Sequence, residues 1–244
     1  MASGGLCMKS NFLEQARGLL LENSSPEAAE GARRFFKEEV LCYGVKSAVV
    51  KKIAKTVLAG IKKTHSRDEI LAACEELWRS GYLEEGGLAC EWTFALRKDF
   101  QPDDFKVFER WVGSYVGNWA SCDTLCNHSL AAFVDMYPEF LPDIKGWAAS
   151  ENRWKRRAAA VTFIVPGRRG DYLADILEIA EKLLEDGDDM VQKGYGWMLK
   201  AASESHPEKV FEFIMARKDR MPRTAFRYSL EKMPEQWRAE AMKK

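Results

Sequence analysis

Residues 172–184 read YLADILEIAEKLL, and the apolar side chains in this stretch recur three and four residues apart: Tyr172, Leu173, Ile176, Leu177, Ala180, Leu183 and Leu184. This spacing gathers them on one face of an amphipathic helix. The same spacing recurs nearly everywhere else in the chain, for example from Ile70 to Trp78, and segments in which apolar and polar residues alternate are missing. The pattern therefore predicts an all-α protein.

A weak internal repeat adds detail to this prediction. Similar short sequences recur near Glu91, Asp123, Arg157 and Lys193, at steps of about 32 to 36 residues, which is typical of helix pairs that bury their apolar faces by stacking on their neighbours. We therefore expect an α-solenoid of stacked antiparallel helix pairs (HEAT-like repeats), with a concave groove along which these four polar residues form a row. Residues 11–244 are expected to form this single repeat domain, and residues 1–10 a flexible leader.

The charge balance excludes a globally basic nucleic-acid-binding protein, because 37 lysines and arginines are balanced by 37 aspartates and glutamates. Locally the charges are asymmetric. Residues 33–63 hold nine basic and two acidic side chains, and residues 145–170 hold seven basic and one acidic. A single charge run is ordinarily a solvated helix face, but two separated basic blocks are also compatible with a local contact to nucleic acid.

The six cysteines are scattered without a Cys-x-x-Cys pair, and neither a signal peptide nor an apolar run of membrane-spanning length is present. These features favour a reducing cytoplasm and no membrane partner. Cys122, Cys126 and His128 lie close together in the sequence, but a structural zinc site needs more ligands than the chain offers nearby. We expect no metal and no cofactor, and we interpret these cysteines as buried apolar residues rather than as nucleophiles.

The most informative segment is residues 117–126, GNWASCDTLC. It places Trp119 and Asp123 four residues apart, so an indole and a carboxylate share one helix face within reach of a common ligand. Taken alone, this spacing also fits a packing tryptophan and a surface aspartate near a helix start. Other segments of the chain are needed to choose between the two interpretations.

The Trp-x-x-x-Asp spacing in a helical-repeat chain resembles the active-site helix of the AlkD-like DNA alkylation repair glycosylase family. Three further segments agree in order and approximate separation: residues 33–47, with RRFFK followed by YGVKS; residues 152–158, NRWKRRA; and residues 191–199, VQKGYGWML. The resemblance spans residues 32–233 and consists of several moderately specific motifs in the right order.

This resemblance implies a role for individual residues. Asp123 matches the catalytic aspartate of the family, Trp119 and Trp197 match its two groove tryptophans, and Arg157 matches its arginine near the phosphates. The neighbouring basic and aromatic residues that would also contact DNA are Arg156, Lys193, Phe35, Lys37 and Lys46. Phe35 stands where the family can show a tyrosine, which removes a hydroxyl group and keeps the aromatic face.

The implied reaction agrees with the residues present. Hydrolysis of an ordinary glycosidic bond uses two carboxylates, but an N3- or N7-alkylated purine is already cationic and leaves as a neutral base. One carboxylate therefore suffices, and Asp123 would hold a water and stabilise the oxocarbenium-like sugar. The expected substrate is double-stranded DNA containing alkylated purines, acted on by a monomer without metal and without full extrusion of the base into a pocket.

A different interpretation is a non-catalytic module of the same fold that binds damaged or branched DNA, or a protein partner. The joint presence of Trp119, Asp123, Arg157 and Trp197 favours the enzyme. Most of the eight tryptophans are expected in the core, since Trp78, Trp92, Trp111 and Trp147 have apolar neighbours at helical spacing.

Overall fold

The computed structural model describes the backbone of residues 4–243 and the side chains of residues 12–243. Within this range the regular structure is helical, and the extended segments form a single isolated bridge between Leu41 and Tyr82. The predicted all-α fold is therefore confirmed. No helix in the described range is long and apolar enough to cross a membrane.

The contacts between residues group the chain into two compact units, residues 1–124 and residues 125–244. Unit 1 contains α1 (Gly4–Glu22), α2 (Pro26–Arg33), α3 (Ser47–Ile61), α4 (Arg67–Arg79), α5 (Leu83–Ala95), η1 (Arg97–Asp99), α6 (Asp104–Ser114) and α7 (Trp119–Thr124). Unit 2 contains the π-helical turn η2 (Leu125–Leu130), α8 (Ala131–Met136), η3 (Pro138–Phe140), α9 (Leu141–Gly146), η4 (Trp147–Ala149), α10 (Arg153–Val161), α11 (Ile164–Arg169), α12 (Leu173–Lys182), α13 (Asp189–Ala202), α14 (Pro207–Met215), α15 (Arg223–Leu230) and α16 (Glu235–Ala241).

The predicted leader and domain boundaries can be compared with these bounds only in part. Residues 1–3 lie outside the described residues, and from Gly4 onward the backbone of the expected leader belongs to α1. The predicted single repeat domain over residues 11–244 stays a prediction.

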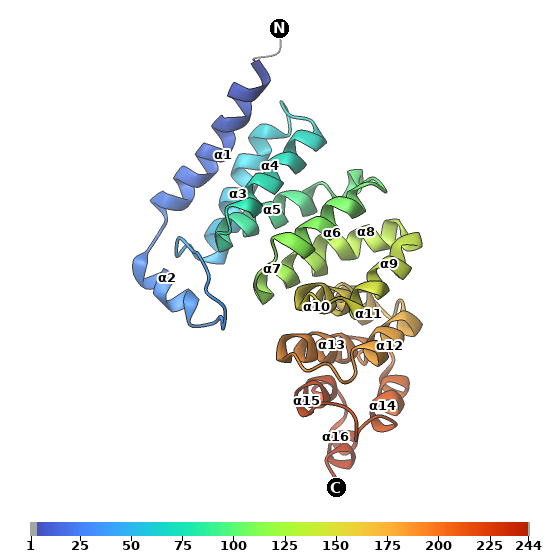
Figure 1. Cartoon of the computed structure of the whole chain (residues 1–244). Coiled ribbons are helices and arrows are strands. Elements are labelled where there is room, and N and C mark those ends of the chain that lie inside the picture. The colour runs from blue at the N-terminus through green and yellow to red at the C-terminus, as the bar shows by residue number, and fades with distance from the viewer. Residues whose placement is uncertain (1–3, 244) are drawn as a thin grey trace. The chain divides into compact units, whose positions relative to one another are not determined.

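In unit 1 the apolar faces of neighbouring helices pack against one another. α3 packs against both α1 and α5, while α5 also packs against α4 and α7 (Figure 1). The buried side chains of α3 follow the helical spacing that the sequence shows: Val50, Ile53, Ala54, Val57, Leu58 and Ile61. α4 starts at a capping box, in which Ser66 and Glu69 each bind the backbone N–H of the other. These contacts place α5 beside both α3 and α7, and the capping box fixes where α4 begins.

Unit 2 is organised around α13. This helix packs against α10 on one side and α15 on the other, and it also contacts α11 and α12 (Figure 1). Asp188 caps its N-terminus by accepting hydrogen bonds from the backbone N–H groups of Met190 and Val191, at 2.8 and 3.3 Å. The two charged residues of the predicted row in this unit, Arg157 and Lys193, thus lie on adjacent helices, α10 and α13.

The core contains the aromatic residues that the apolar spacing predicts. Trp78, Trp92, Trp111 and Trp147 are all buried, which confirms their assignment to the core. The five cysteines whose side chains are described are also buried, including Cys122 and Cys126. The interpretation of these two cysteines as buried apolar residues is therefore confirmed.

Candidate functional site

The helix α7 presents Trp119 and Asp123 at the surface of unit 1. Asn118 starts this helix, since its side-chain oxygen accepts a hydrogen bond from the backbone N–H of Ser121 at 2.9 Å. Cys122, next to Asp123 in the chain, is completely buried, whereas Trp119 and Asp123 are partly exposed. The helix therefore buries one face in unit 1 and leaves Trp119 and Asp123 partly exposed on the other.

Trp119 is held in place by the segment that joins α2 to α3, residues 34–46, which we call the α2–α3 loop. The indole ring stacks on Phe36, with ring centroids 5.4 Å apart and an interplanar angle of 23°. Its Nε1 donates a hydrogen bond to the backbone carbonyl of Phe35 at 3.4 Å. One face and the N–H of the indole are thus used inside unit 1, and the orientation of the ring depends on this loop.

Two buried glutamates at the start of α5 anchor the far end of the α2–α3 loop. Glu84 accepts hydrogen bonds from the backbone N–H groups of Tyr43, Gly44 and Val45 at 3.0, 2.8 and 3.0 Å. Glu85 accepts one from the Tyr43 hydroxyl at 2.7 Å. The two carboxylates thereby clamp the loop through its backbone and through one side chain.

The charge of Glu85 is balanced by Arg17, whose guanidinium lies 2.9 Å from the carboxylate. The hydrogen bond to Glu85 raises the pKa of Arg17, so this arginine stays charged. Burial, followed by the hydrogen bond to Glu85, raises the pKa of Tyr43 well above that of a free tyrosine. Tyr43 therefore remains a hydrogen-bond donor at every pH at which the protein is expected to work.

Gly44 leaves no room for a side chain in this loop. Its φ of +80° lies in the left-handed region, and an added Cβ would meet the Ser25 carbonyl and lie 2.5 Å from the Ala29 nitrogen. We expect Gly44→Ala to lower the free energy of unfolding by about 2 kcal/mol or more, because backbone strain and collision with α2 add together. Denaturant unfolding measures this loss. Gly60→Ala is the control, because Gly60 faces open space on α3. Equal stabilities of the two variants would show that the loop does not require glycine at position 44.

A cavity of about 530 Å³ lies beside Trp119, within unit 1. Its walls come from α2, the α2–α3 loop, α3, α5 and α7, and they include Ala32, Phe36, Val50, Cys90 and Trp119. Most of the lining is apolar, and the buried carboxylate of Glu84 has both oxygens occupied by the loop. The polar residues of the lining include Lys51, Glu91 and Thr124. The sequence did not predict this cavity.

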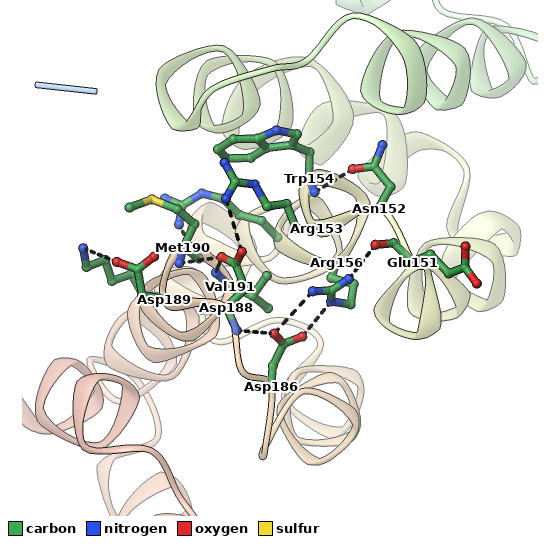
Figure 2. Close-up of polar contacts among 12 residues, drawn as sticks. Glu151, Asn152, Arg153, Trp154, Arg156, Asp186, Asp188, Asp189, Met190 and Val191 are labelled. Carbon is green, nitrogen blue, oxygen red and sulfur yellow. Dashed lines mark hydrogen bonds and ion pairs between the residues drawn. The ribbon is translucent and has the colours of Figure 1, made fainter. Parts of the chain in front are cut away.

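The basic residues of α10 in unit 2 are largely engaged with the protein itself. Figure 2 shows Arg156 directed at Asp186, with Nε 2.6 Å from the carboxylate, while its Nη1 donates to the carbonyls of Ser150 and Glu151. Arg153 lies over the Trp154 ring at 4.6 Å from the centroid and 3.3 Å from Asp188. Of these two arginines, Arg153 has the more exposed side chain, at 36% against 19%.

Arg157 and Lys193 also have partners within unit 2. Arg157 is only 5% exposed and donates to the Met190 carbonyl, and it packs against α13 where Gly194 leaves room, because a Cβ there would lie 3.2 Å from the Arg157 Cγ. Lys193 lies 3.3 Å from Asp189, one turn earlier on α13. The predicted phosphate contacts of Arg156, Arg157 and Lys193 stay predictions, and such a contact by Arg157 would require this side chain to become more exposed.

Replacing Arg157 by Ala tests whether this side chain stabilises unit 2 or contacts a DNA phosphate. The contacts lead us to expect a loss of about 1.5 to 3 kcal/mol in the free energy of unfolding, because a buried side chain and its charged hydrogen bond to the Met190 carbonyl disappear. Thermal and denaturant unfolding measure the loss. A fully stable variant whose DNA binding is weaker, with a salt slope flatter by about one unit, would instead identify Arg157 as a phosphate ligand only.

The remaining predicted residues are distributed over both units. Phe35, Lys37 and Lys46 of the α2–α3 loop are exposed in unit 1, and Trp197 is partly exposed on α13 in unit 2. Trp119 and Asp123 thus share unit 1 with the loop residues, and Trp197 shares unit 2 with Arg157. Sequence reasoning did not identify Phe36 or Glu84, which hold Trp119 and the loop. Within the described residues, no group of three or more His, Cys, Asp or Glu side chains could hold a metal ion.

Comparisons with known proteins identify the family and the fold of the chain. The family model described as "DNA alkylation repair enzyme" matches residues 16–233, most of the chain. A solved structure titled as a predicted DNA alkylation repair enzyme from Enterococcus faecalis is similar with a TM-score of 0.77 and 18% identity, covering 87% of this chain and 98% of that chain. At this identity the likeness concerns the fold, and it confirms the predicted fold class. No curated protein sequence matches this chain.

Proposed function

Since the chain belongs to the DNA alkylation repair enzyme family, we propose that it is a DNA glycosylase that hydrolyses the N-glycosidic bond of cationic N3- or N7-alkylated purines in duplex DNA. The observation that carries the proposal is the pair on α7, where Trp119 and Asp123 are partly exposed four residues apart on a helix whose other face is buried. The pair therefore offers a carboxylate and an aromatic face to the same ligand.

Asp123 supplies the chemistry in this proposal. The alkylated base carries a positive charge and leaves as a neutral molecule, so no acid is needed to protonate it. The Asp123 carboxylate positions and helps to deprotonate the attacking water, and its negative charge stabilises the positive charge that develops on the sugar. Because the base leaves without being protonated, one carboxylate is enough where ordinary glycosidases use two. The proposed reaction requires no metal.

The aromatic residues favour the cationic lesion over an undamaged base. Phe36 stacks on one face of the Trp119 indole, and we assign the other face to the ligand, since an indole face attracts a cation by about 0.5 to 2 kcal/mol. We assign the same role to Trp197 of α13, as the resemblance implies. Cleavage without full extrusion of the base is the part of the proposal that rests on the family resemblance alone.

DNA binding is assigned to basic residues of both units. In unit 1 these are Lys37 and Lys46 on the α2–α3 loop, beside the aromatic pair of Phe35 and Phe36. In unit 2 we assign Arg156, Arg157 and Lys193, as the resemblance implies, and we add Arg153, whose side chain is more exposed than that of Arg156. Such contacts go to phosphates and hold the duplex in register without reading its sequence.

Replacing Lys46 by Ala tests the assignment in unit 1. We expect the affinity for duplex DNA to fall about equally for all sequences, and the slope of log K against log salt to flatten by about one unit, since one phosphate contact disappears. Binding titrations at several salt concentrations measure this. Lys106→Ala on α6, a similarly exposed lysine of the same unit that pairs with Asp103, is the control. A slope that changes equally in both variants would contradict the assignment.

The proposal as a whole is tested by the release of free base. Purified protein is incubated with methylated duplex DNA, with and without a metal chelator, and the released bases are identified by mass spectrometry. We expect release of N3-methyladenine or N7-methylguanine at the same rate in both samples. Duplex binding without release would favour the non-catalytic module, and release that the chelator abolishes would overturn the metal-free mechanism.

A further inference from the structure

The orientation of the Trp119 indole depends on two neighbouring residues of the α2–α3 loop. Phe36 stacks on one face of the ring, and the backbone carbonyl of Phe35 accepts its N–H. The backbone N–H groups of these two phenylalanines donate to the carbonyls of Ala32 and Arg33, at the end of α2. A displacement of the loop would therefore turn the indole or release it.

The loop takes its own place from the start of α5. Glu84 is 4% exposed, and its carboxylate accepts the backbone N–H groups of residues 43–45. One residue earlier, the backbone N–H of Leu83 donates to the Leu41 carbonyl at 2.8 Å. Burial of a carboxylate is costly unless its oxygens are hydrogen-bonded, and hydrogen bonds to a charged acceptor are stronger than neutral ones. Glu84 therefore holds the loop backbone more firmly than a neutral side chain would.

The same helix supports the carboxylate of the proposed site. α7, which carries Trp119 and Asp123, packs against α5. The two helices approach closely at Gly86, two residues after Glu84, where an added Cβ would lie 3.7 Å from the Ser121 Oγ. α5 is thus a common support, which holds both the loop behind the indole and the helix that carries the carboxylate.

We propose that Glu84 is a positioning residue, which sets the orientation of the Trp119 indole relative to the Asp123 carboxylate through the α2–α3 loop. The inference rests on the proposed function and deepens it. Both oxygens of Glu84 bind the loop backbone, so Glu84 acts through Phe36 and the Phe35 carbonyl rather than on the DNA. A misplacement of about 1 Å in an active site can lower a rate about 10²-fold. Loss of the clamp therefore slows excision although no group that faces the lesion is removed.

Fluorine NMR of the full chain labelled with fluorotryptophan measures the surroundings of the indole without any reaction, and Trp119→Phe identifies the Trp119 resonance. Glu84→Gln keeps the size of the side chain, but its amide group cannot accept all three N–H groups of residues 43–45. We expect this variant to shift or broaden the Trp119 resonance. An unmoved Trp119 resonance in folded Glu84→Gln would overturn the inference.

Asp104→Asn is the matched control for this measurement. Asp104 is also a buried carboxylate of unit 1 at the start of a helix, α6, and it accepts the backbone N–H of Gln101 at 2.8 Å. It pairs with Arg67, so its neutralisation removes comparable bonds away from the α2–α3 loop. Asp104→Asn should leave the Trp119 resonance and the excision rate of the folded protein unchanged.

Excision kinetics show whether the orientation of the indole serves the reaction. We expect Glu84→Gln to slow single-turnover release of N7-methylguanine about tenfold or more, with the affinity for the duplex changed less than about twofold. In a Trp119→Ala background, Glu84→Gln should have no further effect, because residues that act through one another are non-additive. A residue that only stabilises unit 1 would lower the rate by the same factor in both backgrounds or in neither.

Phe36→Leu keeps the inference testable if Glu84→Gln does not fold, because it removes the stack on Trp119 and leaves the clamp intact. It should slow excision in the wild-type background and not in Trp119→Ala. A loss caused by Glu84→Gln or Phe36→Leu that persists in full without the indole would overturn the inference. A wild-type protein that releases no methylated base, while Glu84→Gln still moves the Trp119 resonance, would overturn the proposed function instead.

Discussion

Replacing Asp123 by Asn is expected to lower the single-turnover rate of base excision by about 10²-fold or more, while the fold and the affinity for duplex DNA stay unchanged. The amide fills the same space at a partly exposed position on α7, so packing is preserved. The variant loses the negative charge and the basic oxygen that activate water and stabilise the cationic sugar, and groups of this kind contribute rates of that order.

Glu91→Gln provides the matched control for this prediction. Glu91 is also a partly exposed carboxylate of unit 1, on the neighbouring helix α5, where it pairs with Lys51 at 3.7 Å and lines the cavity. Neutralising it should change excision little. If Glu91→Gln loses activity and Asp123→Asn retains it, the catalytic carboxylate has been assigned to the wrong helix of the unit.

Trp92→Ala is expected to lower the free energy of unfolding by about 3 to 5 kcal/mol, the largest stability effect we predict. Trp92 is completely buried on α5, its Nε1 donates to the Ala54 carbonyl at 3.0 Å, and its ring contacts Phe12 with centroids 5.9 Å apart. Truncation leaves a cavity and removes the donor to a buried carbonyl. Denaturant unfolding measures the loss.

Trp119→Ala should behave in the opposite way. The ring is partly exposed, so its removal costs mainly the stack on Phe36 and the hydrogen bond to the Phe35 carbonyl, and we expect a smaller loss of stability. Excision of a cationic purine should fall, since the face that attracts the cation is gone. A Trp119→Ala protein that unfolds while Trp92→Ala stays stable would show that Trp119 belongs to the core.

The fold could be predicted because helical spacing reports burial directly. The apolar residues of 172–184 recur as a helix requires, and residues Ile176, Ile179 and Ala180 are indeed the buried face of α12. The predicted core tryptophans follow the same rule. The loop clamp could not be predicted in this way, because Glu84 binds backbone groups about 40 residues earlier in the chain and two adjacent glutamates in a sequence ordinarily indicate a solvated helix start.

The candidate site could be predicted only where its residues are neighbours in the sequence. Trp119 and Asp123 lie one turn apart, so their common face follows from the spacing. The burial of Arg157 depends instead on Gly194, 37 positions later, whose missing side chain makes room for it. A run of basic residues in the sequence does not show that Lys46 is exposed and Arg157 buried. The packing of one helix against another decides which basic side chain reaches the solvent.

The proposed reaction is tested most directly by single-turnover excision from two duplexes of the same sequence. One contains a single N7-methylguanine, which is cationic, and the other a single hypoxanthine, which is neutral. We predict release of the methylated base by the wild-type protein, a rate at least about 10²-fold lower with Asp123→Asn, and little or no release of hypoxanthine by either. Equal release of both bases, or an unchanged rate in Asp123→Asn, would contradict hydrolysis by one carboxylate acting on a cationic leaving group.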